Sequence, residues 1–336
     1  MKKELTKFSK IWQEKCGTRK RLPHSLPAVD RIIVIGDIHG DLKLLYKFLR
    51  LTNPPLIDSE GNWNGKDTVV VQVGDQIDRC RINIEAGLRC YQPETTLNDE
   101  DSDVQILEYL TKLHNQAQLE GGAVYSLLGN HELMNVKGNM SYVSFKGLVN
   151  FSQSGSVEEG MANRIKLFEP GSKYANFLGC TRQSVLIIGS NIFVHGGIVK
   201  DLAKKYKVKD INKIVSMYLF NELEDPEKYY DLLEHPQICP FWTRFYSGFS
   251  GDYNQFSPDI NKQFCKELDE TLKIYDVNNV IVGHTAQINT GINSNCSNKV
   301  HFVDVGASDA FGNIPNAPTR KAQVLEILND NIFNII

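Results

Sequence analysis

The sequence has no uninterrupted apolar run of the roughly 18 to 20 residues that a membrane-spanning helix requires. Its charged N-terminal segment, MKKELTKFSKIWQEK, also has no apolar stretch of the length found in secretory signal peptides. These two absences predict a soluble, cytoplasmic protein that has no membrane partner.

An excess of basic residues is absent as well. Lys and Arg number 37 against 40 Asp and Glu, which gives the 336-residue chain a formal net charge of -3 at pH 7. Proteins that bind nucleic acids neutralise the phosphates with clustered Lys and Arg side chains. The charge balance therefore predicts no nucleic-acid partner.

The cysteines include no C-x-x-C pair, the spacing typical of zinc sites and redox motifs. They are odd in number and widely spaced, at Cys16, Cys80, Cys90, Cys180, Cys239, Cys265 and Cys296. In an intracellular protein such a pattern favours reduced thiols over a disulfide framework. We therefore interpret all of them as thiols.

Strand and helix patterns alternate along the first half of the chain. Apolar runs predict strands at 31–36, 68–74 and 123–128, and helical spacing predicts helices at 41–51 and 103–119. This alternation is typical of an α/β sheet.

The second half contains further strand patterns, which we assign to a second sheet. They lie in 184–197 and in the runs NVIVGHT, KVHFVDVG and AQVLEIL. No repeat, low-complexity tract or flexible linker separates the two halves, which favours one domain with insertions over two domains. We expect an N-terminal extension over 1–29 and one domain over 30–336, with insertions at about 137–182 and 201–275.

Five short polar motifs stand where predicted strands end. They are GDIHG (36–40), GDQIDR (74–79), LLGNHE (127–132), VHGG (194–197) and VGHT (282–285). Side chains at the carboxyl ends of strands in open α/β sheets meet at one crevice, so residues far apart in sequence can share a ligand there. A single motif of this kind is weak evidence, because Gly-Asp turns and packed histidines are common, but the ordered set of five predicts a common site.

Oxygen atoms and imidazole nitrogens dominate the side chains that these motifs supply. Carboxylate, amide and imidazole ligands suit manganese, iron or zinc, and their number exceeds what one tetrahedral ion takes. We therefore predict two divalent metal ions, Mn²⁺ in the first place and iron or zinc as alternatives. Two-metal sites hold their ions about 3.5 to 4 Å apart, which calls for a bridging carboxylate. Asp75, in the middle motif, is the expected bridge.

The ordered set GDIHG, GDQIDR, GNHE, HGG and GHT resembles the signature of the calcineurin-like metallophosphoesterases. Within them, GD-x-x-DR followed by GNHE is similar to the phosphoprotein phosphatases, which act on phosphoserine and phosphothreonine. LLGNHELMN resembles the Shewanella-type branch of that family. The similarity spans roughly 31–310. It implies two mixed β-sheets packed as a sandwich and flanked by helices, with helical and loop insertions as a lid.

The resemblance also assigns roles to residues of the motifs. It implies that the metal ligands are Asp37, His39 and Asp75 for the first ion, and Asp75, Asn130, His195 and His284 for the second. It further implies His131 as the general acid, Asp78 as its partner and Arg79 as a clamp for the phosphate, with a metal-bound hydroxide attacking phosphorus in line. Glu132 has no metal bond in the family, so we expect a supporting role.

A dianionic monoester usually needs more than one guanidinium, and Arg244 is our choice for the second. Packing of Arg244 on Trp242 or Tyr246 is the alternative interpretation. Two other arginines, Arg164 and Arg182, are alternatives to Arg244 for this second guanidinium.

The sequence departs from the family pattern at Cys80, where the family has Gly. We interpret Cys80 as an inert thiol, with sensitivity to oxidants as the alternative. Asp304 and Asp309 follow a predicted strand and are candidates for supporting the ligands.

The leading functional hypothesis is a two-metal phosphomonoesterase that acts on phosphorylated protein. Hydrolysis of dinucleoside polyphosphates or other small phosphoesters uses the same kind of metal core and is an alternative. Phosphoserine, phosphothreonine and phosphotyrosine are not distinguished by the motifs. A pseudo-phosphatase that binds a partner without turnover is a third hypothesis, against which the full set of ligands argues. The sequence makes no prediction of the oligomeric state.

Overall fold

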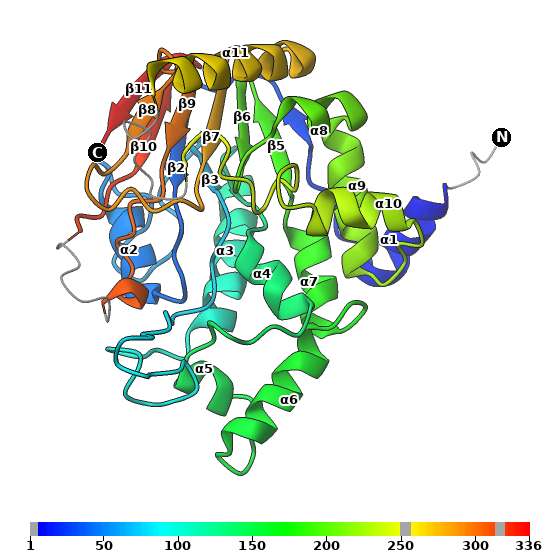
Figure 1. The fold of residues 1–336 in the computed structure, drawn as a ribbon, viewed down its shortest axis with the longest axis vertical. Coiled ribbons are helices and arrows are strands. Elements are labelled where there is room, and N and C mark those ends of the chain that lie inside the picture. Colours follow the sequence, from blue (N-terminus) through cyan, green and yellow to red (C-terminus); the bar gives the residue numbers. More distant parts are fainter. Residues whose placement is uncertain (1–5, 249–256, 313–319) are drawn as a thin grey trace.

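The computed structural model describes residues 6–248, 257–312 and 320–336, and within them two β-sheets are flanked by helices (Figure 1). The five-stranded sheet has the order β11-β10-β2-β3-β4, formed by Ile332–Ile335, Leu325–Leu328, Arg31–Ile35, Val69–Gln72 and Ala123–Ser126. The six-stranded sheet has the order β1-β5-β6-β7-β9-β8, formed by Ser25–Leu26, Val185–Ile188, Asn191–Val194, Asn279–Val282, Val300–Phe302 and Asn293–Asn295. Both sheets mix parallel and antiparallel pairs, which confirms the predicted fold class.

The two sheets share one apolar core. β2 and β3 are rich in Ile and Val and are buried along almost their whole length, as expected for parallel strands covered on both faces. Ile33 and Val70 of the five-stranded sheet belong to the same buried cluster as Leu186, Phe193 and Ile281 of the six-stranded sheet. This shared cluster makes the arrangement a sandwich.

Helices cover the outer faces of the sandwich. α2 (Leu42–Arg50) and α3 (Asp103–Gln118) pack against the five-stranded sheet through side chains such as Leu45 and Leu110. The other sheet packs against α7 (Lys173–Thr181), α8 (Lys200–Lys205), α9 (Val208–Leu219) and α11 (Pro258–Tyr275). In Figure 1, α11 crosses the top of the molecule. Among the described residues, no helix is long and apolar enough to cross a membrane.

The predicted insertion at 137–182 is more helical than its polar composition indicates. It contains α5 (Phe145–Val149), α6 (Val157–Phe168) and α7, and α5 and α6 form the lower end of the molecule in Figure 1. Ser144 and Ser156 cap the first two of these helices, with their hydroxyls accepting from backbone N–H groups of the first turn. The second insertion contains α8, α9, α10 (Pro226–Tyr229), a π-helical turn (Tyr230–Glu234) and α11, and its residues 249–256 lie outside the described residues.

One strand was assigned to the wrong sheet. The run AQVLEIL forms β10, which pairs antiparallel with β2 in the five-stranded sheet rather than joining the strands of the second half. Its partner on the other side is β11, at the end of the chain. The alternation of side chains within β10 specifies a strand but not which sheet it joins, so only the long-range packing decides this.

The N-terminal segment packs on the domain. Ile11 and Trp12 of α1 (Lys7–Cys16) are buried against Phe220, and α1 contacts α7. β1 then adds a parallel strand to the six-stranded sheet beside β5. The domain boundary at residue 30 stays a prediction.

The interpretation of the cysteines as reduced thiols is wrong for most of them. Disulfides join Cys16 to Cys180, Cys80 to Cys90, and Cys265 to Cys296. The paired residues are separated by 164, 10 and 31 positions, so only the fold brings them within bonding distance. Of the described cysteines, Cys239 alone is free, and it is buried.

Candidate metal centre

The five motifs follow β2, β3, β4, β6 and β7, and the sheets bring their ends together. β2, β3 and β4 run parallel, with Gln72 at the end of β3 paired to both Ile35 and Ser126. β6 and β7 are parallel as well, with Val194 opposite Val282. The loops after these strands therefore leave each sheet at one edge, and α4 (Asn130–Val136) begins directly in the third of them.

The loops hold several motif residues in a backbone conformation that is rare for residues other than glycine. The φ angles of His39, Asp75, Asp78 and His284 are 48°, 51°, 74° and 66°, all in the left-handed region. The backbone N–H of His39 donates to the carbonyl of Asp75 at 2.9 Å, which ties the first two loops together. Such conformations persist only where the surrounding structure fixes them, and they concentrate at functional sites.

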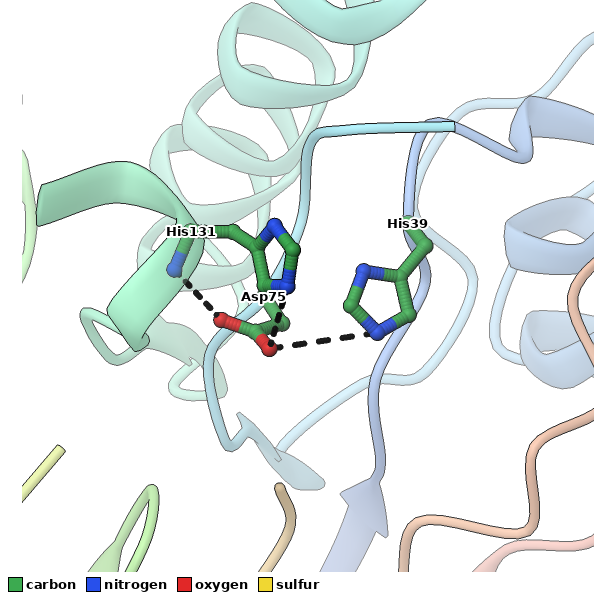
Figure 2. A group of neighbouring side chains, drawn as sticks. All are labelled: His39, Asp75 and His131. Atoms are coloured by element: carbon green, nitrogen blue, oxygen red, sulfur yellow. Dashed lines mark hydrogen bonds and ion pairs between the residues drawn. The ribbon is translucent and has the colours of Figure 1, made fainter. Parts of the chain in front are cut away.

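One cluster of ligand atoms is formed by His39, Asp75 and His131 (Figure 2). Their ligand atoms all lie within 4.8 Å of one another, and Asp75 Oδ2 is 3.8 Å from the Nε2 atoms of both imidazoles. Figure 2 shows both rings facing the Asp75 carboxylate. Asp37 lies next to this cluster, with Oδ2 3.8 Å from His39 Nε2.

A second cluster contains Asp75, His195 and His284. His195 Nε2 lies 3.3 Å from Asp75 Oδ2 and 2.9 Å from Asn130 Oδ1, while its Nδ1 lies 2.9 Å from the carbonyl of Val73. The contact with the carbonyl orients the ring, a common arrangement for a metal-binding histidine. Asp75 belongs to both clusters, so the structure brings all six predicted ligands together around one carboxylate.

The electrostatics of the clusters fit divalent cations. Burial, with the negative charges of Asp304 and Asp75, raises the pKa of Asp37 well above its usual range. Burial also lowers the pKa values of His39 and His284 well below the usual range, which favours the neutral imidazole that metals bind. Buried carboxylates beside neutral imidazoles are stabilised when a cation joins them.

Two glycines allow the carboxylates to approach the backbone closely. A Cβ atom at Gly129 would overlap the Asp75 carboxylate, and one at Gly283 would overlap that of Asp37. The GNHE and GHT motifs therefore need glycine at these positions to pack against the predicted ligands.

His131, a member of the first cluster, also forms a buried pair with Asp78. His131 Nδ1 lies 2.7 Å from Asp78 Oδ2, and Asn135 Nδ2 donates to Asp78 Oδ1 at 2.8 Å. Arg164 supports this arrangement, because its Nε donates to Asn135 Oδ1 at 2.8 Å and its Nη2 donates to Asp103 at 2.7 Å. The imidazole is therefore fixed on one side, and its Nε2 faces Asp75.

Glu132 connects two of the motif loops. Its carboxylate accepts from the backbone N–H groups of Gly129 at 2.6 Å and Gln76 at 2.7 Å, and also from those of Asp75 and Ile77. The side chain thus holds the loop after β3 against the start of α4, in keeping with a supporting role.

A cavity of about 450 Å³ opens over the clusters, and Arg81 and Arg244 are the arginines that line it. Arg244 Nη1 donates to the carbonyl of His284 at 2.8 Å and to Thr285 Oγ1 at 2.7 Å. The guanidinium is therefore held at the rim of the second cluster. Arg182, one of the alternatives to Arg244, is buried elsewhere and donates to Gln76 and Thr111.

Arg79 is placed differently from the prediction. Its side chain is 1% exposed, does not line the cavity, and pairs with Asp41, with Nη1 3.1 Å from Oδ2. The motif spacing identified the loop but not which of its two arginines faces the cavity. Arg164 is also buried and turned away from the cavity.

Part of the cavity wall was not predicted from the sequence. Besides Arg81, the aromatic side chains of Tyr142, Trp242 and Phe311 line the cavity. Asp304, a predicted candidate for supporting the ligands, lines it as well. Arg81 stands two positions after Arg79, so its charge beside the motif was the available signal. The aromatic residues come from three separate segments, and no local pattern connects them.

The calcineurin-like phosphoesterase family model matches residues 30–287 of the chain. Among related sequences, an uncharacterised protein of Acanthamoeba polyphaga mimivirus is 39% identical over 253 residues, which are 68% of this chain and 97% of the viral protein. Shewanella-like protein phosphatase 2 of Arabidopsis thaliana is 28% identical over 345 residues, covering 91% of this chain and 77% of the plant protein. Shewanella-like protein phosphatase 1 of Plasmodium berghei is 30% identical over 278 residues, covering 83% and 67%.

Solved structures resemble the whole arrangement. A cold-active protein-tyrosine phosphatase of a psychrophile, Shewanella sp., superposes with a TM-score of 0.63 at 21% identity, over 94% of this chain and 83% of that chain. At this level of identity the likeness shows the fold of two sheets.

Proposed function

Because the chain belongs to the calcineurin-like phosphoesterase family, we propose that it hydrolyses phosphomonoesters with two divalent metal ions, and that its substrates are phosphoserine and phosphothreonine in proteins. The similarity to Shewanella-like protein phosphatases of two organisms supports a phosphorylated protein as substrate. The main structural support is the Asp75 carboxylate, which is shared by two clusters of ligand atoms, one of which includes His131 with its partner Asp78.

The proposed ligands are Asp37, His39, Asp75, Asn130, His195 and His284. When bound there, two divalent cations supply a nucleophile from water and stabilise the negative charge of the phosphoryl oxygens. The carboxylate and imidazole set suits Mn²⁺, with iron or zinc as alternatives.

His131 and Asp78 serve in this proposal to protonate the leaving group. The carboxylate of Asp78, 2.7 Å from His131 Nδ1, orients the ring so that Nε2 can give a proton to the departing alkoxide. Arg244 binds phosphoryl oxygens at the rim of the cavity, where its guanidinium is anchored by Thr285.

Phosphotyrosine is a second candidate substrate, favoured by the aromatic wall of the cavity. Tyr142, Trp242 and Phe311 could pack against the ring of an aryl phosphate. The similar Shewanella protein is named a protein-tyrosine phosphatase, although the likeness at 21% identity carries the fold alone. Small phosphoesters such as dinucleoside polyphosphates remain the third class to test.

A hydrolysis panel tests these proposals together. The purified protein, supplied with Mn²⁺, is assayed with peptides carrying phosphoserine, phosphothreonine or phosphotyrosine, and with diadenosine tetraphosphate and cyclic AMP. Turnover of the first two peptides supports the leading proposal, and preference for phosphotyrosine or the dinucleotide replaces it with that class. Binding of phosphopeptide without any turnover would favour the pseudo-phosphatase.

Two variants separate metal binding from proton transfer. We expect His131→Ala to lower kcat by roughly 10²- to 10⁴-fold with unchanged metal content, because general acids contribute in that range. Asp75→Asn should instead deplete bound metal, as measured by elemental analysis. Full occupancy of both ions in Asp75→Asn would contradict the bridging role.

A further inference from the structure

We infer that Arg81 binds the substrate phosphoryl group together with Arg244, in place of Arg79, to which the motif assigned this role. The inference rests on the proposed phosphatase function and assigns a residue to its substrate site. Arg81 and Arg244 would then bind the phosphoryl group together, since both line the cavity over the ligand clusters.

Arg79 is not free to bind a substrate. Besides its ion pair with Asp41, Nη1 donates to the carbonyl of Gly40 at 3.1 Å, and Nη2 donates to the carbonyl of Asn98 at 3.1 Å and to Asp309 Oδ2 at 3.4 Å. Both ends of the guanidinium are therefore engaged within the protein. If Arg79 turned away to bind a substrate, the buried carboxylate of Asp41 would lose its ion-pair partner. An unpaired buried charge is costly in free energy.

Arg81 lines the cavity, unlike Arg79, although it lies only two residues further along the loop. Its side chain is partly exposed, and its guanidinium carbon lies 4.5 Å from the ring centroid of Phe311 and 5.5 Å from that of Tyr142. These rings form walls that hold the planar group facing the cavity. Nη1 donates to the carbonyl of Cys80 at 2.8 Å, which anchors one edge.

The other edge of the guanidinium reaches the metal ligands. Nη2 of Arg81 lies 2.7 Å from His39 Nε2. The same nitrogen cannot both accept from Arg81 and hold a cation, so a cation on His39 requires Nη2 to turn to another acceptor. Phosphoryl oxygens are suitable acceptors, because a guanidinium binds them with two parallel N–H groups.

The disulfide between Cys80 and Cys90 fixes the loop that carries Arg81. Cys80 is buried, and its backbone N–H donates to the carbonyl of Tyr142 at 3.1 Å. The residue before Arg81 is thus tied both to Cys90, further along the same loop, and to a residue of the cavity wall. A side chain held in this way loses less conformational entropy when it binds a ligand.

Phosphate binding by the Mn²⁺-loaded protein tests the role of Arg81 independently of turnover. The variants are Arg81→Ala and Arg81→Lys, and the matched control is Arg89→Ala. Arg89 is an exposed arginine of the same loop that lines a different cavity, so its removal deletes one positive charge without touching the site. Calorimetry measures the dissociation constant of inorganic phosphate, elemental analysis measures bound manganese, and thermal melting reports folding.

We expect Arg81→Ala to raise the dissociation constant of phosphate roughly 10- to 100-fold, the usual effect of losing a hydrogen bond to a charged group, with unchanged manganese content. Arg81→Lys should recover little of this loss, because an ammonium lacks the planar pair of donors. Arg89→Ala should behave like the wild type. If both Arg81 variants fold and bind phosphate as tightly as the wild type, the inference is wrong.

The failure of the proposed function has a different signature. A wild-type protein that binds phosphate through Arg81 but hydrolyses no substrate of the panel would support the inference and contradict the enzymatic proposal. Turnover with a KM that does not depend on Arg81 would contradict the inference alone. A manganese-loaded wild type that binds no phosphate would overturn both.

Discussion

Asp75 is the residue on which the candidate site depends most. Its Oδ2 atom is approached by three imidazoles, at 3.3 Å from His195 and at 3.8 Å from His131 and His39. Although burial opposes ionisation, the charges of His195 and His131 hold the pKa of Asp75 well below its usual range. The carboxylate is therefore available as an anion to bridge two cations.

A histidine outside the site predicts how stability depends on pH. Burial lowers the pKa of His301 from 6.5 to about 4, and its ring stacks on Phe333 at 4.2 Å between centroids. Among the described residues its Nε2 has no hydrogen-bond partner. The neutral form is favoured in the folded state, so the stability due to His301 is present above pH 6.5 and is lost as the pH falls from 6.5 towards 4.

We expect His301→Phe to remove this part of the acid sensitivity. Between pH 7.5 and pH 5, the wild type should lose about 2 kcal/mol more free energy of unfolding than the variant, by the linkage between pKa and stability. Urea unfolding at the two pH values measures the difference. Replacement of an exposed histidine, His24→Gln, serves as the control, and parallel losses in the wild type and His301→Phe would contradict the assignment.

The position of a single residue in the site could be predicted where a side chain able to bind a metal ion stands in one of the five motifs. The motif residues from Asp37 to His284 were brought together by strands whose ends could be located from apolar runs alone. Arg79 and Arg81 show the limit, because both are arginines of one loop and differ only in the direction of the side chain. That direction depends on Asp41 and Phe311, which contact Arg79 and Arg81 from other segments.

At the scale of elements, strands and helices with a strong apolar period were located well. The predicted helix at 103–119 corresponds to α3, and the predicted strands at 31–36 and 68–74 correspond to β2 and β3 within two residues at each end. The helices α5 and α6 were missed because they are short and half polar. Their caps, Ser144 and Ser156, were the local signal that could have revealed them.

Disulfides also belong to this scale, because they tie elements to one another or, for Cys80 and Cys90, close part of one loop. They are characteristic of proteins in oxidising compartments, so the cytoplasmic location loses the support of reduced cysteines and stays a prediction from the sequence. The bond between Cys16 and Cys180 joins α1 to the end of α7, across 164 residues of chain.

Removing this bond should destabilise the fold without emptying the metal centre. For a long closed loop we expect the double variant Cys16→Ser and Cys180→Ser to lower the free energy of unfolding by about 2 to 5 kcal/mol, since the unfolded chain gains freedom. Denaturant unfolding of the oxidised proteins measures the change, and manganese content should equal that of the wild type. Treatment with a reductant should then lower the stability of the wild type more than that of the variant. An unchanged midpoint in the variant would show that the bond does not constrain the chain.

At the scale of the whole molecule, the candidate metal centre joins the two sheets. The five-stranded sheet supplies Asp37, Asp75 and Asn130 from the loops after β2, β3 and β4, and the six-stranded sheet supplies His195 and His284 after β6 and β7. The two-sheet fold class could be predicted from the family resemblance. The pairing of β10 with β2 could not be predicted. These strands lie about 290 residues apart in the sequence, and no local pattern indicates that they pair.

Ions bound between the sheets should stabilise the whole domain rather than one loop. A ligand present at 100 times its dissociation constant adds about 2.7 kcal/mol to the free energy of unfolding, so removing Mn²⁺ with a chelator should lower Tm by roughly 4 °C for each bound ion in a chain of this size. His195→Ala removes one ligand contributed by the six-stranded sheet, and its Tm should respond less to the chelator than that of the wild type. Circular dichroism and differential scanning fluorimetry, with and without Mn²⁺, measure both shifts. Identical melting curves for the wild type in the two conditions would mean that no cation joins the sheets at Asp75.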